Sequence, residues 1–187
     1  MTSNAREALL TAARKIVQSH GFGGLNFRDL AQDVGIKAAS IYYHFPSKVD
    51  LGAAVAKRYW EDGAAALEAI AAEHPDPAEC LHLFPQIFRR SLESENRLCL
   101  GSFMGTESQD LPDMVNREVQ AFADVNVAWL AKMLVAAGLA SPGEAEPRAR
   151  AIFAALAGAQ LMARMRSDIA LFDNLVGTYR ATGLIPA

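Results

Sequence analysis

Two short amphipathic segments, with a glycine between them and a proline behind them, restrict the fold more than any other feature. Residues 26–34 begin at Asn26, which is a good N-terminal helix cap, and Gly35 ends that segment. Residues 38–45 form the second segment, and Pro46 ends it because the residue before proline avoids the helical region. The pattern predicts two short helices joined by a tight turn.

The rest of the chain also has helical periodicity, and the alternation typical of strands is almost absent. The 51% of hydrophobic residues is ample for a core. We expect an all-α fold of about nine helices, with a head over residues 1–48 and a larger helical part over residues 49–187. Besides the two short segments, the expected helices are residues 3–20, 47–73, 78–94, 99–107, 112–137, 143–165 and 168–182.

Charge is spread unevenly along the chain. Residues 1–58 carry eight basic and four acidic side chains, whereas the remainder carries ten basic and seventeen acidic side chains. A basic head on an acidic body indicates that the head alone meets a polyanion, although a chance asymmetry on a solvated surface gives the same numbers.

Other features argue against membranes, metals and catalysis. The most apolar run, residues 151–163, is too short to cross a bilayer and is interrupted by Gln160. The two cysteines, Cys80 and Cys99, accompany no export signal, so we expect reduced thiols in a cytoplasmic protein. The four histidines have no metal-ligand spacing and no catalytic motif occurs, so we expect no cofactor, no metal ion and no enzymatic activity.

The two short helices form a helix-turn-helix, in which the second helix enters the major groove of DNA. Ile41 and Phe45 lie four residues apart and are expected to face the core, so Tyr42 and Tyr43 can face the duplex. A tyrosine hydroxyl can donate to a phosphate, and its ring can pack on a sugar or a thymine methyl group. His44 and Lys48 are also placed to reach the DNA backbone.

Residues 6–58 resemble the DNA-binding domain of TetR/AcrR-family transcriptional regulators. The resemblance lies in "AARKIVQSHGFGGLNFRDLAQDVGIKAASIYYHFPSKVDL" and above all in its Tyr-x-His-Phe and x-Ser-Lys elements. It implies a homodimeric repressor that binds a double-stranded DNA operator and leaves it when the larger part binds a small molecule. By position, the resemblance implies that the DNA-binding residues are Asn26, Arg28, Lys37, Ala39, Ser40, Tyr42, Tyr43, His44 and Lys48.

The start of the second helix departs from the family pattern. Lys37, Ala38 and Ala39 stand where many members have a Ser or Thr cap and more polar side chains. Few side chains there can make base-specific hydrogen bonds. We therefore expect specificity to depend on Lys37, on Ser40, on contacts to thymine methyl groups or on DNA shape.

An apolar stripe in residues 112–137 is interrupted by Asn126, and one in residues 143–165 is interrupted by Gln160. A buried amide needs a partner, which is either a neighbouring helix or a ligand, and the sequence leaves both open. A mostly apolar effector fits such a lining. The candidate ligand-binding residues are Trp60, Phe84, Phe88, Phe103, Met104, Phe122, Asn126, Trp129, Met133 and Gln160.

Small residues in "AALAGAQ", residues 154–160, permit close helix packing. This suits the dimer seam that the resemblance implies, in which two helices of each subunit form a four-helix bundle. The candidate dimer residues are Phe153, Ala154, Ala157, Phe172, Leu175, Val176 and Tyr179.

Two alternative functions remain beside an effector-responsive regulator. Cys99 lies near Arg97, which could lower the pKa of its thiol and make the protein a redox or electrophile sensor of the same fold. A small helical enzyme or binding protein without a regulatory role is the alternative from another class, and the sequence disfavours it.

Overall fold

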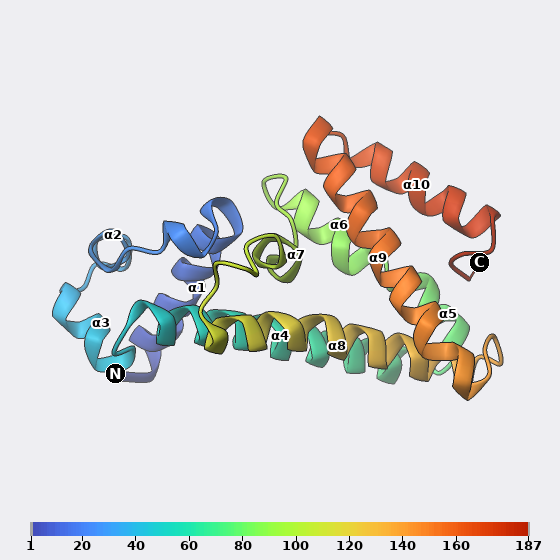
Figure 1. Cartoon of the computed structure of the whole chain (residues 1–187), viewed down its shortest axis with the longest axis horizontal. Helices are drawn as coiled ribbons and strands as arrows, with labels where there is room; N and C mark the ends of the chain where they lie inside the picture. The colour runs from blue at the N-terminus through green and yellow to red at the C-terminus, as the bar shows by residue number, and fades with distance from the viewer. Residues whose placement is uncertain (1, 187) are drawn as a thin grey trace. The chain divides into compact units, whose positions relative to one another are not determined.

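The computed structural model describes residues 2–186, which form α-helices and one short 3-10 helix without any strand (Figure 1). The expected all-α class is confirmed. The helices are α1 (Thr2–His20), η1 (Phe22–Gly24), α2 (Phe27–Val34), α3 (Ala38–His44), α4 (Lys48–Glu73), α5 (Pro77–Leu83), α6 (Gln86–Glu93), α7 (Leu100–Gly105), α8 (Asp113–Ala136), α9 (Pro142–Arg166) and α10 (Ile169–Ala181).

The chain divides into two compact units. Unit 1 contains the residues up to Glu61 together with Leu100–Phe122, and unit 2 contains Asp62–Cys99 together with the residues from Ala123 onward. Helices α4 and α8 each contribute residues to both units. Unit 1 is therefore larger than the expected head of residues 1–48, because residues 49–61 and a segment from the middle of the chain also belong to it.

Local capping interactions set the helix boundaries in unit 1. The Asn26 side chain accepts hydrogen bonds from the backbone N–H groups of Arg28 and Asp29 at the start of α2. Gly35 ends α2 in the left-handed conformation, with a φ of 73° that suits glycine. At the start of α4, the Ser47 hydroxyl donates to the Asp50 carboxylate and accepts from the Asp50 backbone N–H.

The core of unit 1 is built from the inward faces of its helices. The helices are amphipathic, so the buried side chains on the apolar face of each recur at helical spacing. The fully buried members from residues 2–61 are Leu9, Ala13, Val17, Leu30, Ile41 and Leu51.

In unit 2, the segment expected as one helix over residues 78–94 is two helices, α5 and α6. Pro85 stands between them and has no backbone N–H, so it cannot continue the helical hydrogen-bond ladder. Arg89 of α6 donates two hydrogen bonds to the Asp173 carboxylate of α10, at 2.8 and 3.0 Å. This pairing ties α6 to α10 and raises the pKa of Arg89.

Gln160 of α9 is fully buried, and both ends of its amide have protein partners. Its Oε1 accepts from the backbone N–H of Cys99 at 3.1 Å, and its Nε2 donates to the carbonyl of Phe88 at 2.7 Å. The partners of the buried Gln160 amide in this structure are therefore backbone groups of neighbouring segments of the protein, which is one of the two alternatives that the sequence left open. Asn126 is also buried, with 3% of its surface exposed, and it has an interaction of its own.

Helix α8 is long and apolar enough, by length and composition, to cross a membrane. The expectation that no segment is long and apolar enough to cross a membrane does not hold for this helix by length and composition alone. Val127, Leu130 and Leu134 of α8 are buried in unit 2, and a buried helix of this kind passes the same test.

Replacing Gln160 with Met tests its structural role. The Gln160→Met variant keeps the side-chain size but removes the hydrogen bonds to the Cys99 N–H and to the Phe88 carbonyl. We expect the free energy of unfolding in urea to fall by about 2–4 kcal/mol. Gln120→Met, on the exposed face of α8, is the control and should change it by less than about 0.5 kcal/mol. Equal effects of the two variants would contradict this role.

Candidate nucleic-acid interface

Helices α2 and α3 of unit 1 pack against each other across the Gly35 turn. The backbone N–H of Ile36 donates to the carbonyl of Ala31 at 2.9 Å, which fixes the turn. Ala31 is buried, and its small side chain lets the two helices approach closely. The predicted helix-turn-helix is therefore present.

Helix α3 has one buried face and one exposed face. Ile41 and Phe45 are 0% and 2% exposed, whereas Tyr42 and Tyr43 are 57% and 78% exposed. This is the orientation that the row of rings predicted. The exposed face of α3 also carries Lys37, Ala39 and Ser40.

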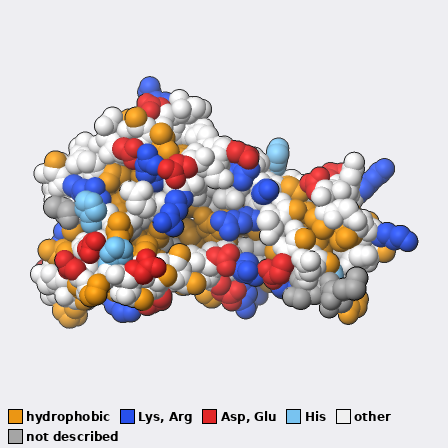
Figure 2. All heavy atoms as spheres, turned by 180° about the vertical axis from the view of Figure 1, so that it is seen from behind, with side chains coloured by type: hydrophobic (Ala, Val, Ile, Leu, Met, Phe, Trp, Pro, Cys, Tyr) orange, Lys and Arg blue, Asp and Glu red, His pale blue; other side chains and the backbone are white. Residues whose placement is uncertain are grey.

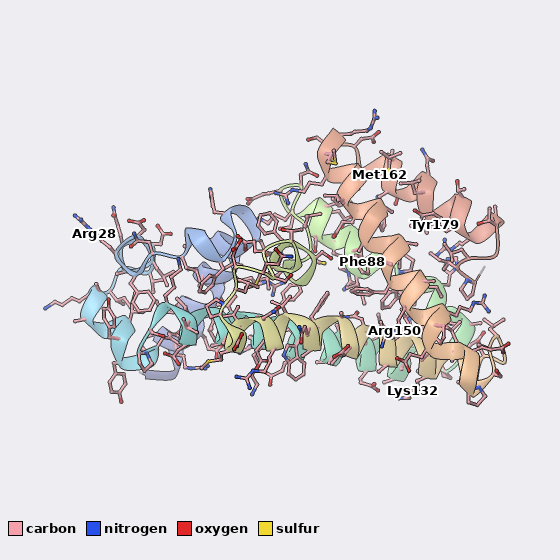
Figure 3. All side chains as sticks on the ribbon, viewed as in Figure 1. Arg28, Phe88, Lys132, Arg150, Met162 and Tyr179 are labelled. Atoms are coloured by element: carbon pink, nitrogen blue, oxygen red, sulfur yellow. The ribbon has the colours of Figure 1, made fainter. Side chains whose placement is uncertain are left out.

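A shallow groove of about 360 Å³ lies between the start of α2 and α3. The Tyr42 ring stands edge-on to the Phe27 ring, with their centres 4.9 Å apart, so Phe27 supports Tyr42 beside this groove. Arg28 extends outward from α2 (Figure 3). Figure 2 shows Lys and Arg side chains projecting at the edge of the molecule where α2 and α3 lie. The groove is lined by Leu25, Asn26, Phe27, Arg28, Ala38, Tyr42 and Lys48.

Lys48 has contacts that its sequence position did not suggest. Its Nζ donates to the carbonyl of Gly23 at 2.9 Å and lies 4.9 Å from the centre of the Phe22 ring. The lysine therefore holds the turn η1 and also lines the groove.

Two other predicted DNA-binding residues have structural contacts of their own. The Oδ1 atom of Asn26 caps α2, at 2.8 Å from the backbone nitrogen of Arg28. His44 is half-buried, and its ring centre lies 5.2 Å from that of Tyr43. His44 and Lys48 are the half-buried members of the predicted set, and its other members are exposed.

The predicted ligand-binding residues fall into both units. Trp60, Phe103, Met104 and Phe122 belong to unit 1, where the Trp60 indole N–H donates to Glu118 at 2.7 Å. The remaining members belong to unit 2 and are Phe84, Phe88, Asn126, Trp129, Met133 and Gln160.

In unit 2, the Trp129 ring stacks on Phe84 at 5.8 Å, and Phe84 packs on Phe88 at 5.9 Å. A groove of about 270 Å³ between α4 and α8 includes Trp129, which is the one member of the predicted ligand set among its lining residues. The other lining residues, which lie outside the predicted ligand set, are Ala64, Leu67, Glu68, Val125, Ala128 and Lys132.

The predicted dimer residues do not share one exposed face. Phe172 and Val176 are 1% and 6% exposed and lie in the core of unit 2. Phe153 is half-buried against Phe88, with ring centres 5.7 Å apart, and Ala157, Leu175 and Tyr179 are half-buried too. Ala154 is exposed.

A different apolar stripe is exposed on α9. Leu161, Met162 and Met165 are 44%, 48% and 77% exposed, and Met162 is labelled in Figure 3. With the exposed residues Ala154 and Gly158, they recur at helical spacing. That spacing was visible in the sequence, but periodicity alone did not separate this face of α9 from its buried face.

Both cysteines of the chain are buried. The Cys80 thiol donates to the carbonyl of His74 at 3.1 Å, and burial raises the pKa of this thiol. Cys99 is 1% exposed, and Arg97 is paired with Glu95. Within residues 2–186, no three His, Cys, Asp or Glu side chains gather as metal ligands would.

Comparison with known proteins agrees with this geometry. Residues 9–55 match the family described as bacterial regulatory proteins, tetR family. The nucleoid occlusion factor SlmA of Vibrio vulnificus is 29% identical over 119 residues, which are 62% of this chain and 61% of SlmA. The chain therefore matches less than two thirds of the length of this relative.

Solved structures match over nearly the whole chain. A TetR transcriptional regulator from Legionella pneumophila is 30% identical, with a TM-score of 0.88 over 94% of this chain and 95% of that one. A TetR-family regulator from Agrobacterium tumefaciens is 26% identical, with a TM-score of 0.89 over 100% of both chains. The chain therefore belongs to the TetR family of DNA-binding transcriptional regulators.

Proposed function

We propose that the protein is a homodimeric, cytoplasmic repressor that binds a palindromic operator and leaves it when a small, mostly apolar effector binds. The observation that carries the proposal is the exposed face of α3, where Tyr42 and Tyr43 stand outward over a buried Ile41. Two adjacent exposed tyrosine rings on one helix form an apolar patch of the kind that marks an interaction surface. The major groove and its flanking phosphates supply that partner.

Side-chain chemistry determines which of the predicted DNA-binding residues suit base edges and which suit the sugar–phosphate backbone. Lys37, Ser40 and the methyl group of Ala39 are at the start of α3, the part of a recognition helix that faces base edges. Tyr42, Tyr43, His44, Arg28 and the Asn26 amide suit the sugar–phosphate backbone. Lys48 lines the groove beside α3 and suits a phosphate.

The exposed stripe of α9 supports a dimer. Met165 is 77% exposed, and an apolar patch of this kind marks an interaction surface. Helix α10 packs on α9 and exposes the small residues Ala170, Gly177 and Ala181. Two such helices from each subunit would form the four-helix seam and present two copies of α3 to DNA. Half-sites of a palindrome lie about 34–36 Å apart.

The groove in unit 2 supports an effector site. Its walls are mostly apolar, and Glu68 and Lys132 pair at 3.7 Å. The Trp129 indole N–H is buried and has no hydrogen-bond partner among the described residues. A small apolar molecule with one oxygen acceptor would satisfy it, because a buried donor without a partner costs about 1–3 kcal/mol.

Binding of effector and operator would be linked. If the effector lowers the affinity for DNA by some factor, DNA lowers the affinity for the effector by the same factor. Helices α4 and α8, which contribute to both units, are the continuous elements for this coupling. A sensor at Cys99 is the second candidate, but its burial leaves the thiol without access to an oxidant in this conformation.

Loss of the Lys48 charge tests the phosphate contact. Lys48→Ala should weaken binding to every DNA sequence and flatten the slope of log K against log salt by about one unit, since one phosphate contact is lost. Lys57→Ala removes an exposed charge of α4 that pairs with Glu61 and should leave the slope unchanged. Fluorescence anisotropy at several salt concentrations measures both. A wild-type slope in Lys48→Ala would exclude the contact.

Gly158→Glu tests the dimer seam. No atom lies within 4 Å of a Cβ built at Gly158, so the isolated subunit accepts the side chain, whereas a close seam between subunits does not. We expect light scattering to report a monomer with much weaker operator binding. Gly143→Glu makes the same change near the other end of α9, where nothing lies within 4 Å either, and should remain dimeric. A dimeric Gly158→Glu protein would refute this seam.

Trp129→Phe tests the effector site. We would screen short-chain ketones, esters and aryl carbonyl compounds for those that raise the Tm and lower operator affinity. Trp129→Phe keeps an aromatic ring but loses the N–H, so affinity for such a compound should fall about fivefold. The hydrocarbon analogue without oxygen should bind the two proteins equally. If the variant binds the carbonyl compound as tightly as the wild type does, Trp129 is not the donor.

A further inference from the structure

The turn η1 in the head is held by a residue from far along the chain. The Glu107 carboxylate accepts a hydrogen bond from the backbone N–H of Phe22 at 2.9 Å, across 85 positions of sequence, and both residues belong to unit 1. Gly21, with a φ of 70°, leaves the space for this carboxylate, because a Cβ there would lie 2.2 Å from its Oε1 atom. The backbone before η1 is therefore shaped around Glu107.

The same turn is held from its other side. The Phe22 ring lies so close to Gly52 of α4 that a Cβ there would be 2.5 Å from the ring. Lys48 Nζ lies 4.9 Å from the centre of this ring and donates to the carbonyl of Gly23 at 2.9 Å. Glu107, Phe22 and Lys48 thus form one connected set of contacts, in which the carboxylate fixes the turn and the turn fixes the ammonium group.

This set has a consequence for DNA binding. An ammonium group has three N–H donors, and the contacts with Gly23 and the Phe22 ring restrict where the remaining one points. Lys48 also lines the groove beside Tyr42 and Arg28. If η1 shifted, both contacts that orient the ammonium would be lost, and a flexible lysine would pay more entropy to bind a phosphate.

We propose that Glu107 is a positioning residue for operator binding: through Phe22 and the η1 turn it holds Lys48 in place to contact a phosphate. The proposal rests on the phosphate contact of Lys48 proposed above. Glu107 itself touches no DNA in this scheme. It lies in the segment Leu100–Phe122, outside the residues 9–55 that match the family.

Three replacements at Glu107 separate its possible roles. Glu107→Gln keeps an oxygen that accepts from Phe22, so its affinity and salt slope should equal or slightly exceed those of the wild type. Glu107→Ala removes the acceptor, and Glu107→Asp keeps the charge but withdraws it by one methylene group. For both we expect operator affinity to fall about fivefold to tenfold and the salt slope to flatten by about 0.9, the value for one phosphate.

Asp110→Ala is the control, because it removes an exposed carboxylate from the same segment without touching η1. Its affinity and slope should match those of the wild type. Circular dichroism and Tm establish that each variant is folded. If Glu107→Ala does not fold, comparing Glu107→Asp with Glu107→Gln still tests the loss of the hydrogen bond to Phe22, because these two side chains are close in size to glutamate.

A cycle with Lys48→Ala distinguishes this proposal from the one on which it rests. In the Lys48→Ala background, Glu107→Ala should cause no further flattening of the slope. If Lys48→Ala alone leaves the slope unchanged, the phosphate contact itself is wrong and both proposals fail. If Lys48→Ala flattens the slope but Glu107→Ala and Glu107→Asp do not, Lys48 contacts DNA without help from Glu107 and only the positioning role is overturned.

Discussion

The packing of the Phe22 ring on Gly52 is the contact on which the DNA-binding part of unit 1 depends. It brings the turn between α1 and α2 against the start of α4, and no side chain larger than hydrogen fits at that position of α4. Lys48 and Glu107 then hold the two sides of the turn. Helix α2 follows this turn and packs on α1, and α3 packs on α2 in turn.

The sequence predicted those parts of the head that local signals determine. Asn26, Gly35 and Pro46 mark helix boundaries by capping and by backbone restriction, and the structure has its boundaries there. The alternation of buried Ile41 and exposed Tyr42 follows from helical periodicity in the same way. Glu107 could not be predicted, because a contact across 85 positions leaves no pattern in the local sequence.

In unit 2, periodicity predicted the helices but not the role of each face. Helix α9 has a buried face with Ile152 and Leu156 and an exposed apolar face that ends at Met165, and a count of apolar residues does not tell the two apart. Periodicity likewise did not show that Phe172 lies in the core of unit 2. Burial of Gln160 implied a partner, but only the structure identifies the backbone of Phe88 and Cys99 as that partner.

The measurement that tests the regulatory account most directly is selection of bound genomic fragments with the purified protein, followed by footprinting on the most enriched fragment. We expect a palindromic site in which two protected half-sites are centred about one helical turn, or a whole number of turns, apart, because two copies of α3 must reach successive major grooves. A set of fragments with no enriched sequence, or a single unpaired half-site, would contradict it.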